Sequence, residues 1–146
     1  MDYESVTTIE SKRPGVRLQV RRMSFGRRLE LLRRVRDLAR KVEFLEAGKT
    51  AGEQMDAGVL RAEIERTLVL WGVAGISGLQ LDGADATPEA LVERGPEDVF
   101  REALAAVRRE AGLTEEERKN SSSPSTFEDP TRPVGSATLA GNPAWT

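Results

Sequence analysis

Alternating apolar and polar side chains form the first clear pattern of the chain. Val16, Leu18 and Val20 alternate with arginine and glutamine, which is the period of a strand with one buried face. A short β-branched run precedes them, and the Lys-Arg-Pro-Gly segment at 12–15 suits a type II turn. The pattern predicts a β-hairpin over residues 3–22. Because an isolated hairpin is marginally stable in water, we expect it to pack on helices.

The spacing then changes to three and four, which predicts a long helix from Phe25 to about Ala47, capped by Ser24 and ended by Gly48. Its apolar positions cover an arc of about 200°, wider than the roughly 100° stripe of a helix on a surface. One side of the arc holds Phe25, Leu29, Leu32, Val35, Ala39 and Val42, and Leu31, Leu38 and Leu45 extend it. The helix is therefore expected to pack on two sides, or to leave part of the arc for another chain.

A second helix is predicted from about Gln54 to Gly72, after a linker at 50–53. Its apolar positions again lie three and four apart: Ala57, Leu60, Ile64, Thr67, Leu68 and Trp71. The linker is short enough to make the two helices an antiparallel hairpin. A tryptophan at a helix end favours a core anchor over an exposed ligand platform, so Trp71 is expected in the core. Gly58 inside this helix lowers its helix propensity, and the missing side chain would allow close contact with a neighbouring helix.

Turn and cap signals follow one another after the second helix. Asp82-Gly83 between apolar positions predicts a tight hairpin turn, and Thr87-Pro88-Glu89 combines three helix-start signals. Further helices are expected at 88–93 and 96–111, and Gly112 ends the second of them. The fold class predicted is α+β and mainly helical, with an N-terminal β-hairpin, a long helix hairpin, a small β unit and C-terminal helices.

The last part of the chain differs in composition. Residues 1–119 are expected to form one compact, mainly helical domain, with a further helical turn at 113–118. Residues 120–146 are rich in Ser, Thr, Pro and Gly and hold too little apolar surface to fold alone, which predicts a flexible tail. Trp145 near its end has no core to join, and a docking role is one interpretation of it.

Charge is distributed unevenly although the net charge is only −2. Residues 1–48 hold twelve Lys and Arg against seven Asp and Glu, whereas residues 49–146 hold ten against seventeen. The basic helix could meet phosphate. However, no aromatic interleaving or nucleic-acid motif accompanies it, and Glu30 to Arg34 and Asp37 to Lys41 have the spacing of ion pairs within a helix. A solvated face or an acidic protein partner is therefore favoured over nucleic acid.

The sequence gives little support to a catalytic or metal-binding function. The chain has no cysteine and no histidine, which removes the usual nucleophile, the usual general base and the commonest metal ligands. The carboxylates at 82–98 lack the spacing of a calcium loop, and turn and cap roles explain them. Gly72, Gly75 and Gly78 match no phosphate-binding motif, and a helix stop explains them better. We expect no enzyme, no cofactor and no metal, and a cytoplasmic protein without a membrane span.

A set of partner-binding residues follows from the wide apolar arc. Leu31, Leu38 and Leu45 are spaced by seven, as in a coiled-coil or helix-in-groove contact. Arg34 and Lys41 flank them and would orient an acidic partner. The candidate partner-binding residues are Leu31, Leu38, Leu45, Arg34, Lys41 and Trp145. The partner is another protein chain or a second copy of this one, and no membrane.

The middle of the chain resembles a known family. The run Trp-Gly-Val from Trp71, Gly-Leu at 78–79, Asp-Gly at 82–83 and Ala-Thr-Pro-Glu-Ala-Leu at 86–91 is similar to the tail assembly chaperones of long-tailed bacteriophages, and the resemblance covers about residues 16–119. It implies a non-enzymatic chaperone in the host cytoplasm that shields hydrophobic helices of the tape-measure protein, with the tail tube protein recruited through the C-terminal segment. Two other functions stay open: a phage structural or connector subunit, and a nucleic-acid-binding regulator that uses the arginine-rich helix.

Overall fold

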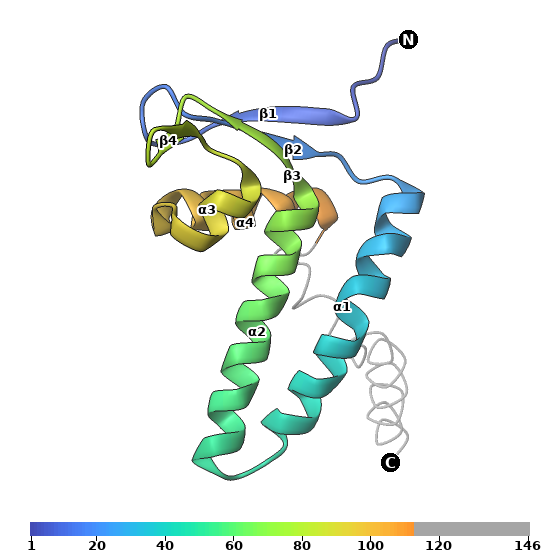
Figure 1. The fold of residues 1–146 in the computed structure, drawn as a ribbon. Helices are drawn as coiled ribbons and strands as arrows, with labels where there is room; N and C mark the ends of the chain where they lie inside the picture. The colour runs from blue at the N-terminus through green and yellow to red at the C-terminus, as the bar shows by residue number, and fades with distance from the viewer. Residues whose placement is uncertain (113–146) are drawn as a thin grey trace, which may run out of the picture. The chain divides into compact units, whose positions relative to one another are not determined.

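Two strands from the N-terminus and one from the middle of the chain form an antiparallel sheet with the order β1-β2-β3 (Figure 1). In the computed structural model, which describes residues 1–112, β1 (Val6–Glu10) pairs with β2 (Arg17–Arg21), and β2 pairs with β3 (Val73–Ser77). Gly15 has a φ of 82° in the β1–β2 turn. Val16, Leu18 and Val20 are all buried. The predicted hairpin and its inward face are confirmed.

The third strand was not predicted, because the glycines after Trp71 were interpreted only as a helix stop. The helix does end at Gly72, but the next five residues continue directly as β3, with Ile76 opposite Leu18 and Val73 opposite Val20. Gly78, which follows β3, has a φ of 78°, and a side chain there would collide with the backbone carbonyl of Gly15 in the β1–β2 turn. Gly78 is therefore required where the end of β3 approaches that turn, and β3 gives the N-terminal hairpin a third strand.

The two long helices, α1 (Phe25–Glu46) and α2 (Ala51–Gly72), form the predicted antiparallel hairpin. Ser24 caps α1 as expected, since its hydroxyl accepts a hydrogen bond from the Arg27 N–H at 3.2 Å. α2 begins three residues earlier than predicted. The Thr50 hydroxyl accepts from the Glu53 N–H at 3.1 Å and donates to the Glu53 carboxylate at 2.7 Å, so the expected linker is a helix cap and first turn.

The region after β3 agrees with the turn and cap signals. β4 (Gln80–Leu81) and β5 (Ala84–Asp85) pair across a tight turn, in which Asp82 and Gly83 have φ values of 52° and 83°. α3 (Pro88–Arg94) begins at Thr87, whose hydroxyl accepts from the Ala90 N–H. α4 (Glu97–Ala111) ends at Gly112, which has a φ of 73°. The predicted helices and their caps are confirmed.

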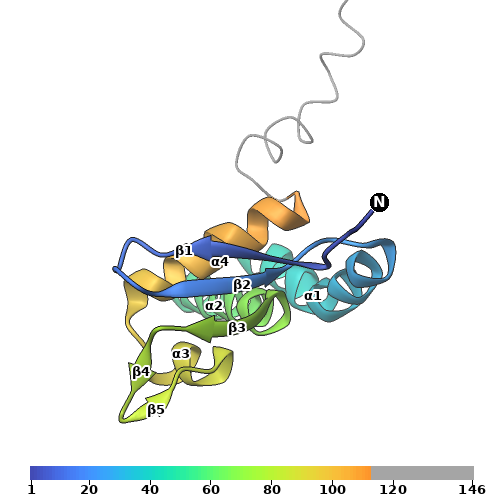
Figure 2. The ribbon, with the colours of Figure 1, turned by 90° about the horizontal axis from the view of Figure 1, so that it is seen from above.

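The hydrophobic core lies where the sheet meets α4, α3 and the end of α2. Figures 1 and 2 show the sheet lying over α4 and the C-terminal end of α2, while α1 and α2 extend away from it. Trp71 belongs to the core cluster with 7% of its surface exposed, and Val69 and Val99 are fully buried. The prediction that Trp71 anchors the core is confirmed, as is the α+β, mainly helical fold class.

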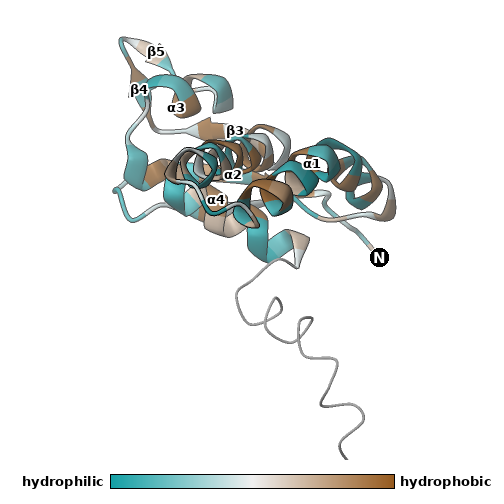
Figure 3. Cartoon of the chain, turned by 90° about the horizontal axis from the view of Figure 1, so that it is seen from below, coloured by the Kyte–Doolittle hydropathy of each residue, from teal (hydrophilic) through white to brown (hydrophobic). Residues whose placement is uncertain are grey.

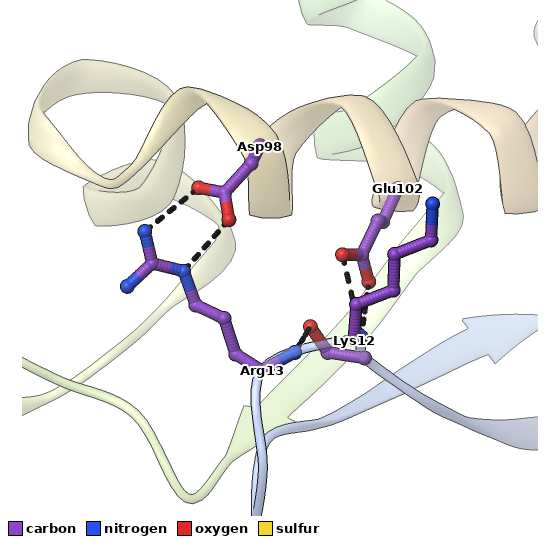
Figure 4. Close-up of polar contacts among 5 residues, drawn as sticks. Lys12, Arg13, Asp98 and Glu102 are labelled. Carbon is purple, nitrogen blue, oxygen red and sulfur yellow. Dashed lines mark hydrogen bonds and ion pairs between the residues drawn. The ribbon is translucent and has the colours of Figure 1, made fainter.

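The tip of the β1–β2 hairpin is attached to α4 by polar contacts (Figure 4). The Arg13 guanidinium donates two hydrogen bonds to the Asp98 carboxylate, at 2.7 and 3.0 Å, and the Lys12 N–H donates to the Glu102 carboxylate at 3.1 Å. The hydrogen bond and the charge of Arg13 lower the pKa of Asp98. Both side chains of the ion pair are about half exposed, so it contributes modestly to stability and mainly fixes the hairpin's position.

Several predictions fall on residues 113–146 and lie outside the described residues. They are the helical turn at 113–118, the tail at 120–146 and the docking role of Trp145. Within residues 1–112, none of the helices is long and apolar enough to cross a membrane.

Candidate partner-binding surface

The far end of the helix hairpin, where α1 ends and α2 begins, lies away from the sheet (Figure 1). Its connection is held by side-chain bonds. The Gln54 side-chain amide donates to the backbone carbonyls of Glu46 and Gly48, at 3.2 and 2.9 Å, and Arg61 forms an ion pair with Glu46 at 3.4 Å. The last turn of α1 and the first turns of α2 are therefore fixed relative to each other.

α1 presents its apolar residues on two sides, as the width of its arc predicted, but the division between the sides differs from the expected one. Val35 and Val42 face inward as expected, and Leu31 joins them, whereas Phe25, Leu29 and Leu32 are exposed. Leu31 is buried with 4% of its surface exposed and packs in the core, and Leu38 and Leu45 are half-buried. Phe25 is 85% exposed and Leu32 is 58% exposed. Residues one position apart on a helix differ in direction by about 100°, so Leu31 and Leu32 cannot both face the core.

The prediction that Leu31 contributes to partner binding is therefore wrong. Leu31 packs in the core of the molecule, and the accessible apolar residues of α1 lie mainly on the other side of the helix. Figure 3, in which the hairpin is seen from below, shows hydrophobic and hydrophilic segments alternating around α1. Leu38 and Leu45 remain candidates, because part of each side chain is accessible.

An open apolar pocket of about 330 Å³ lies on one face of the hairpin near its far end. Phe44, Leu45 and Leu60 supply its apolar surface, and Arg40 and Lys41 supply two cations. Phe44 is 77% exposed, which is unusual for an aromatic side chain in a folded domain. α1 contributes four of these residues and α2 contributes Leu60, so the pocket depends on the packing of the two helices.

The structure brings two of the predicted binding residues together, Lys41 and Leu45, which both line the pocket. Arg34 lies two turns earlier on α1 and forms the predicted ion pair with Glu30 at 2.8 Å. For the second predicted pair, Asp37 to Lys41, the structure differs: Asp37 contacts Arg36 at 3.4 Å, and Lys41 lies at the pocket. Trp145 is outside the described residues.

Three residues of the pocket were not predicted: Arg40, Phe44 and Leu60. The sequence pattern placed Leu60 in the apolar stripe of the second helix. In the structure its side chain is half-buried and part of it faces the pocket. Phe44 carried a signal, because it stands one position before Leu45 and outside the spacing of three and four that defines the buried side of α1. A large aromatic residue outside such a spacing, on a helix rich in arginine, is a reasonable sign of a binding surface.

Several of the carboxylates at 82–98 that could have formed a metal site are engaged with arginines. Asp82 contacts Arg94 at 3.0 Å, and Glu93 contacts Arg66 at 2.8 Å. Asp98 is bound by Arg13, as described above. Across residues 1–112 no three acidic side chains lie close enough together to hold a metal ion.

Comparisons of the chain with family models, curated proteins and solved structures found no match. The resemblance to tail assembly chaperones therefore stays a hypothesis.

Proposed function

We propose that this chain is a non-enzymatic tail assembly chaperone of a long-tailed phage, acting in the host cytoplasm. It shields hydrophobic helices of the tape-measure protein until the tail is assembled. The observation that carries the proposal is the pocket formed by Phe44, Leu45 and Leu60 beside Arg40 and Lys41. The resemblance of residues 16–119 to such chaperones supplies the identity of the partner.

The pocket has the chemistry needed to hold an amphipathic helix. Its apolar surface suits one large aliphatic or aromatic side chain, and burial of such a side chain stabilises a complex by about 1.5–3 kcal/mol. Arg40 and Lys41 favour acidic residues next to that side chain and repel basic ones. Helix-in-groove recognition combines such an anchor with further contacts three, four and seven residues away.

Binding through one small pocket is weak and reversible, which fits a chaperone better than a permanent structural contact. A single anchor of this size falls far short of the roughly 8 kcal/mol that a micromolar complex requires, so neighbouring contacts must contribute. Leu38 and Leu45 are half-buried on α1 and can add to the contact. Release from such a site needs no covalent step and no cofactor.

The test is co-expression with the tape-measure protein encoded in the same genome, which we expect as a very long gene immediately downstream. The wild-type chain should keep that protein in the soluble fraction and co-purify with it. Phe44→Glu should abolish both effects with the fold unchanged, because Phe44 is exposed. Ala105→Glu, at an exposed position on α4, adds the same charge elsewhere and should behave like the wild type.

Two results would reject the proposal: a tape-measure protein that stays insoluble beside the wild-type chain, or a Phe44→Glu variant that protects it fully. Mass spectrometry of purified virions separates a chaperone, which leaves the particle, from a structural subunit, which stays in it. A nucleic-acid-binding regulator would instead show binding to DNA or RNA that falls steeply with salt.

A further inference from the structure

Two further apolar surfaces lie on the outer edges of the helix hairpin, apart from the pocket. Phe25, Leu29 and Leu32 on α1 are all exposed, and we call this stripe the α1 edge. Met55, Val59 and Ala62 on α2 are also exposed, at 73% and 62% for the first two, and we call them the α2 edge. The core and pocket of the described unit involve neither edge.

The two edges have the same pattern and point in different directions. Each stripe has spacings of four and then three, which places its residues along one helix face over about 10 Å. Leu29 is two positions from the buried Leu31, and Val59 is two positions from the buried Ala57, so each edge faces away from the seam between the helices. The edges therefore lie on opposite sides of the hairpin.

The charges around the two edges are opposite. α1 carries seven Lys and Arg against four Asp and Glu, whereas α2 carries two against four. Arg33 lies next to the α1 edge in sequence and Asp56 lies next to the α2 edge, whereas Arg36 and Glu63 are already paired with Asp37 and Arg66. A like pairing of two α1 edges would bring arginines together, which is unfavourable, but an α1 edge opposite an α2 edge brings opposite charges together.

We infer that the occupant of these edges is a second copy of this chain, bound with its α2 edge against the α1 edge of the first. Equal spacing lets the two apolar stripes pack as neighbouring helices, and the flanking charges select this pairing over the two like pairings. Because each copy offers the two edges on opposite sides, the contact is head-to-tail. Such a contact continues to further copies unless the rotation between them closes a ring.

Two stripes of three side chains make a small interface, and small interfaces give weak, concentration-dependent association. Its electrostatic part should weaken with salt, since both edges are exposed to solvent. The inference is independent of the proposed function, because the edges and the pocket use different residues.

The test is sedimentation velocity of the full chain from about 1 μM to about 1 mM, a range that covers weak complexes. The wild type should rise above its monomer mass of 16.1 kDa as concentration increases, and less so at high salt. Leu32→Glu removes the α1 edge and Val59→Arg removes the α2 edge. Each variant alone should stay monomeric. A mixture of the two retains one unaltered edge of each kind, so it should form a one-to-one dimer.

Leu29→Glu and Met55→Arg repeat the test at second positions, in case either first variant fails to fold. Ala105→Glu and Ala105→Arg are the matched controls for added charge, and both should associate like the wild type. Phe44→Glu should also associate normally, although it is expected to lose the tape-measure protein. A wild type that is monomeric throughout, a single edge variant that still associates, or a mixture that gives no dimer would each overturn the inference.

Discussion

Gly72, the last residue of α2, lies where the helix hairpin joins the sheet and has no room for a side chain. A methyl group there would come within 2.5 and 2.6 Å of the two methyl groups of Val107 on α4. Real side-chain contacts of this kind are essentially never below 3.0 Å, so α2 and α4 would have to separate. Val107 is itself 1% exposed and belongs to the closely packed core cluster, so it cannot move aside without disturbing its neighbours.

The magnitude follows from two opposing terms. Inserting a methyl group into a well-packed core costs about 1–3 kcal/mol. Replacing glycine by alanine in a helix returns about 0.5–1 kcal/mol, because the unfolded chain loses freedom. Taking the middle of each range, we therefore expect Gly72→Ala to lower the free energy of unfolding by about 1 kcal/mol. Gly58, also in α2, has nothing within 4 Å of a built methyl group, so Gly58→Ala should raise the free energy of unfolding by about 0.5–1 kcal/mol.

Urea unfolding of the wild type, Gly72→Ala and Gly58→Ala measures the expected loss and the expected gain in the free energy of unfolding within one helix. Val107→Ala adds a further test, because it removes the two methyl groups that meet the new side chain. Alone it should cost about 2 kcal/mol, but combined with Gly72→Ala it should cost less than the sum of the two single changes. A Gly72→Ala protein as stable as the wild type would show that α2 and α4 are not packed as described. Simple additivity in the double variant would show that Val107 is not the obstacle.

Two further predictions concern the core and the hairpin tip. Trp71→Ala should cost about 3–5 kcal/mol in urea unfolding, as large aromatic truncations in cores do, and a loss below about 1 kcal/mol would place the ring outside the core. Because Arg13 lowers the pKa of Asp98 below its usual value of 3.8, the ion pair stabilises the fold above that value and is lost as the pH falls through the lowered pKa. Asp98→Asn should therefore lower the Tm at pH 7 but not at about pH 2, and an equal difference at both would exclude the ion pair as its cause.

The local elements of the fold could be predicted because each depends on residues close in sequence. Asp82 and Gly83 tolerate a positive φ, and Thr87 places its hydroxyl against an N–H three residues later. The alternation at Val16, Leu18 and Val20 required only that one face of a strand be buried. Such signals act within four or five residues, and no distant partner is needed to interpret them.

The third strand could not be found in this way, because its partner is distant in sequence. Val73–Ser77 pairs with β2, more than fifty residues earlier, and its own segment contains a glycine that weakens any strand signal. The start of α2 was missed for a different reason. Thr50 and Glu53 form a local capping signal that was present in the sequence, and the glycine at 52 led to its interpretation as a linker.

The first two turns of α1 show most clearly what a local pattern cannot predict, because Leu31 is buried there while Phe25, Leu29 and Leu32 are exposed. Phe25, Leu29 and Leu32 are at least as apolar as Leu31, Leu38 and Leu45, so hydrophobic periodicity alone fits a helix rotated either way. The choice is made by residues outside the helix. Ser24 fixes where the first turn begins, Arg28 donates to the Ala111 carbonyl on α4, and Leu31 then joins the same core cluster as Leu68. The apolar surplus that the arc of about 200° implies must end up on the outside. Its position at Phe25, Leu29 and Leu32 follows from the connections at the ends of the helix. The sequence could therefore predict that part of the apolar surface of α1 is exposed, but not which residues carry it.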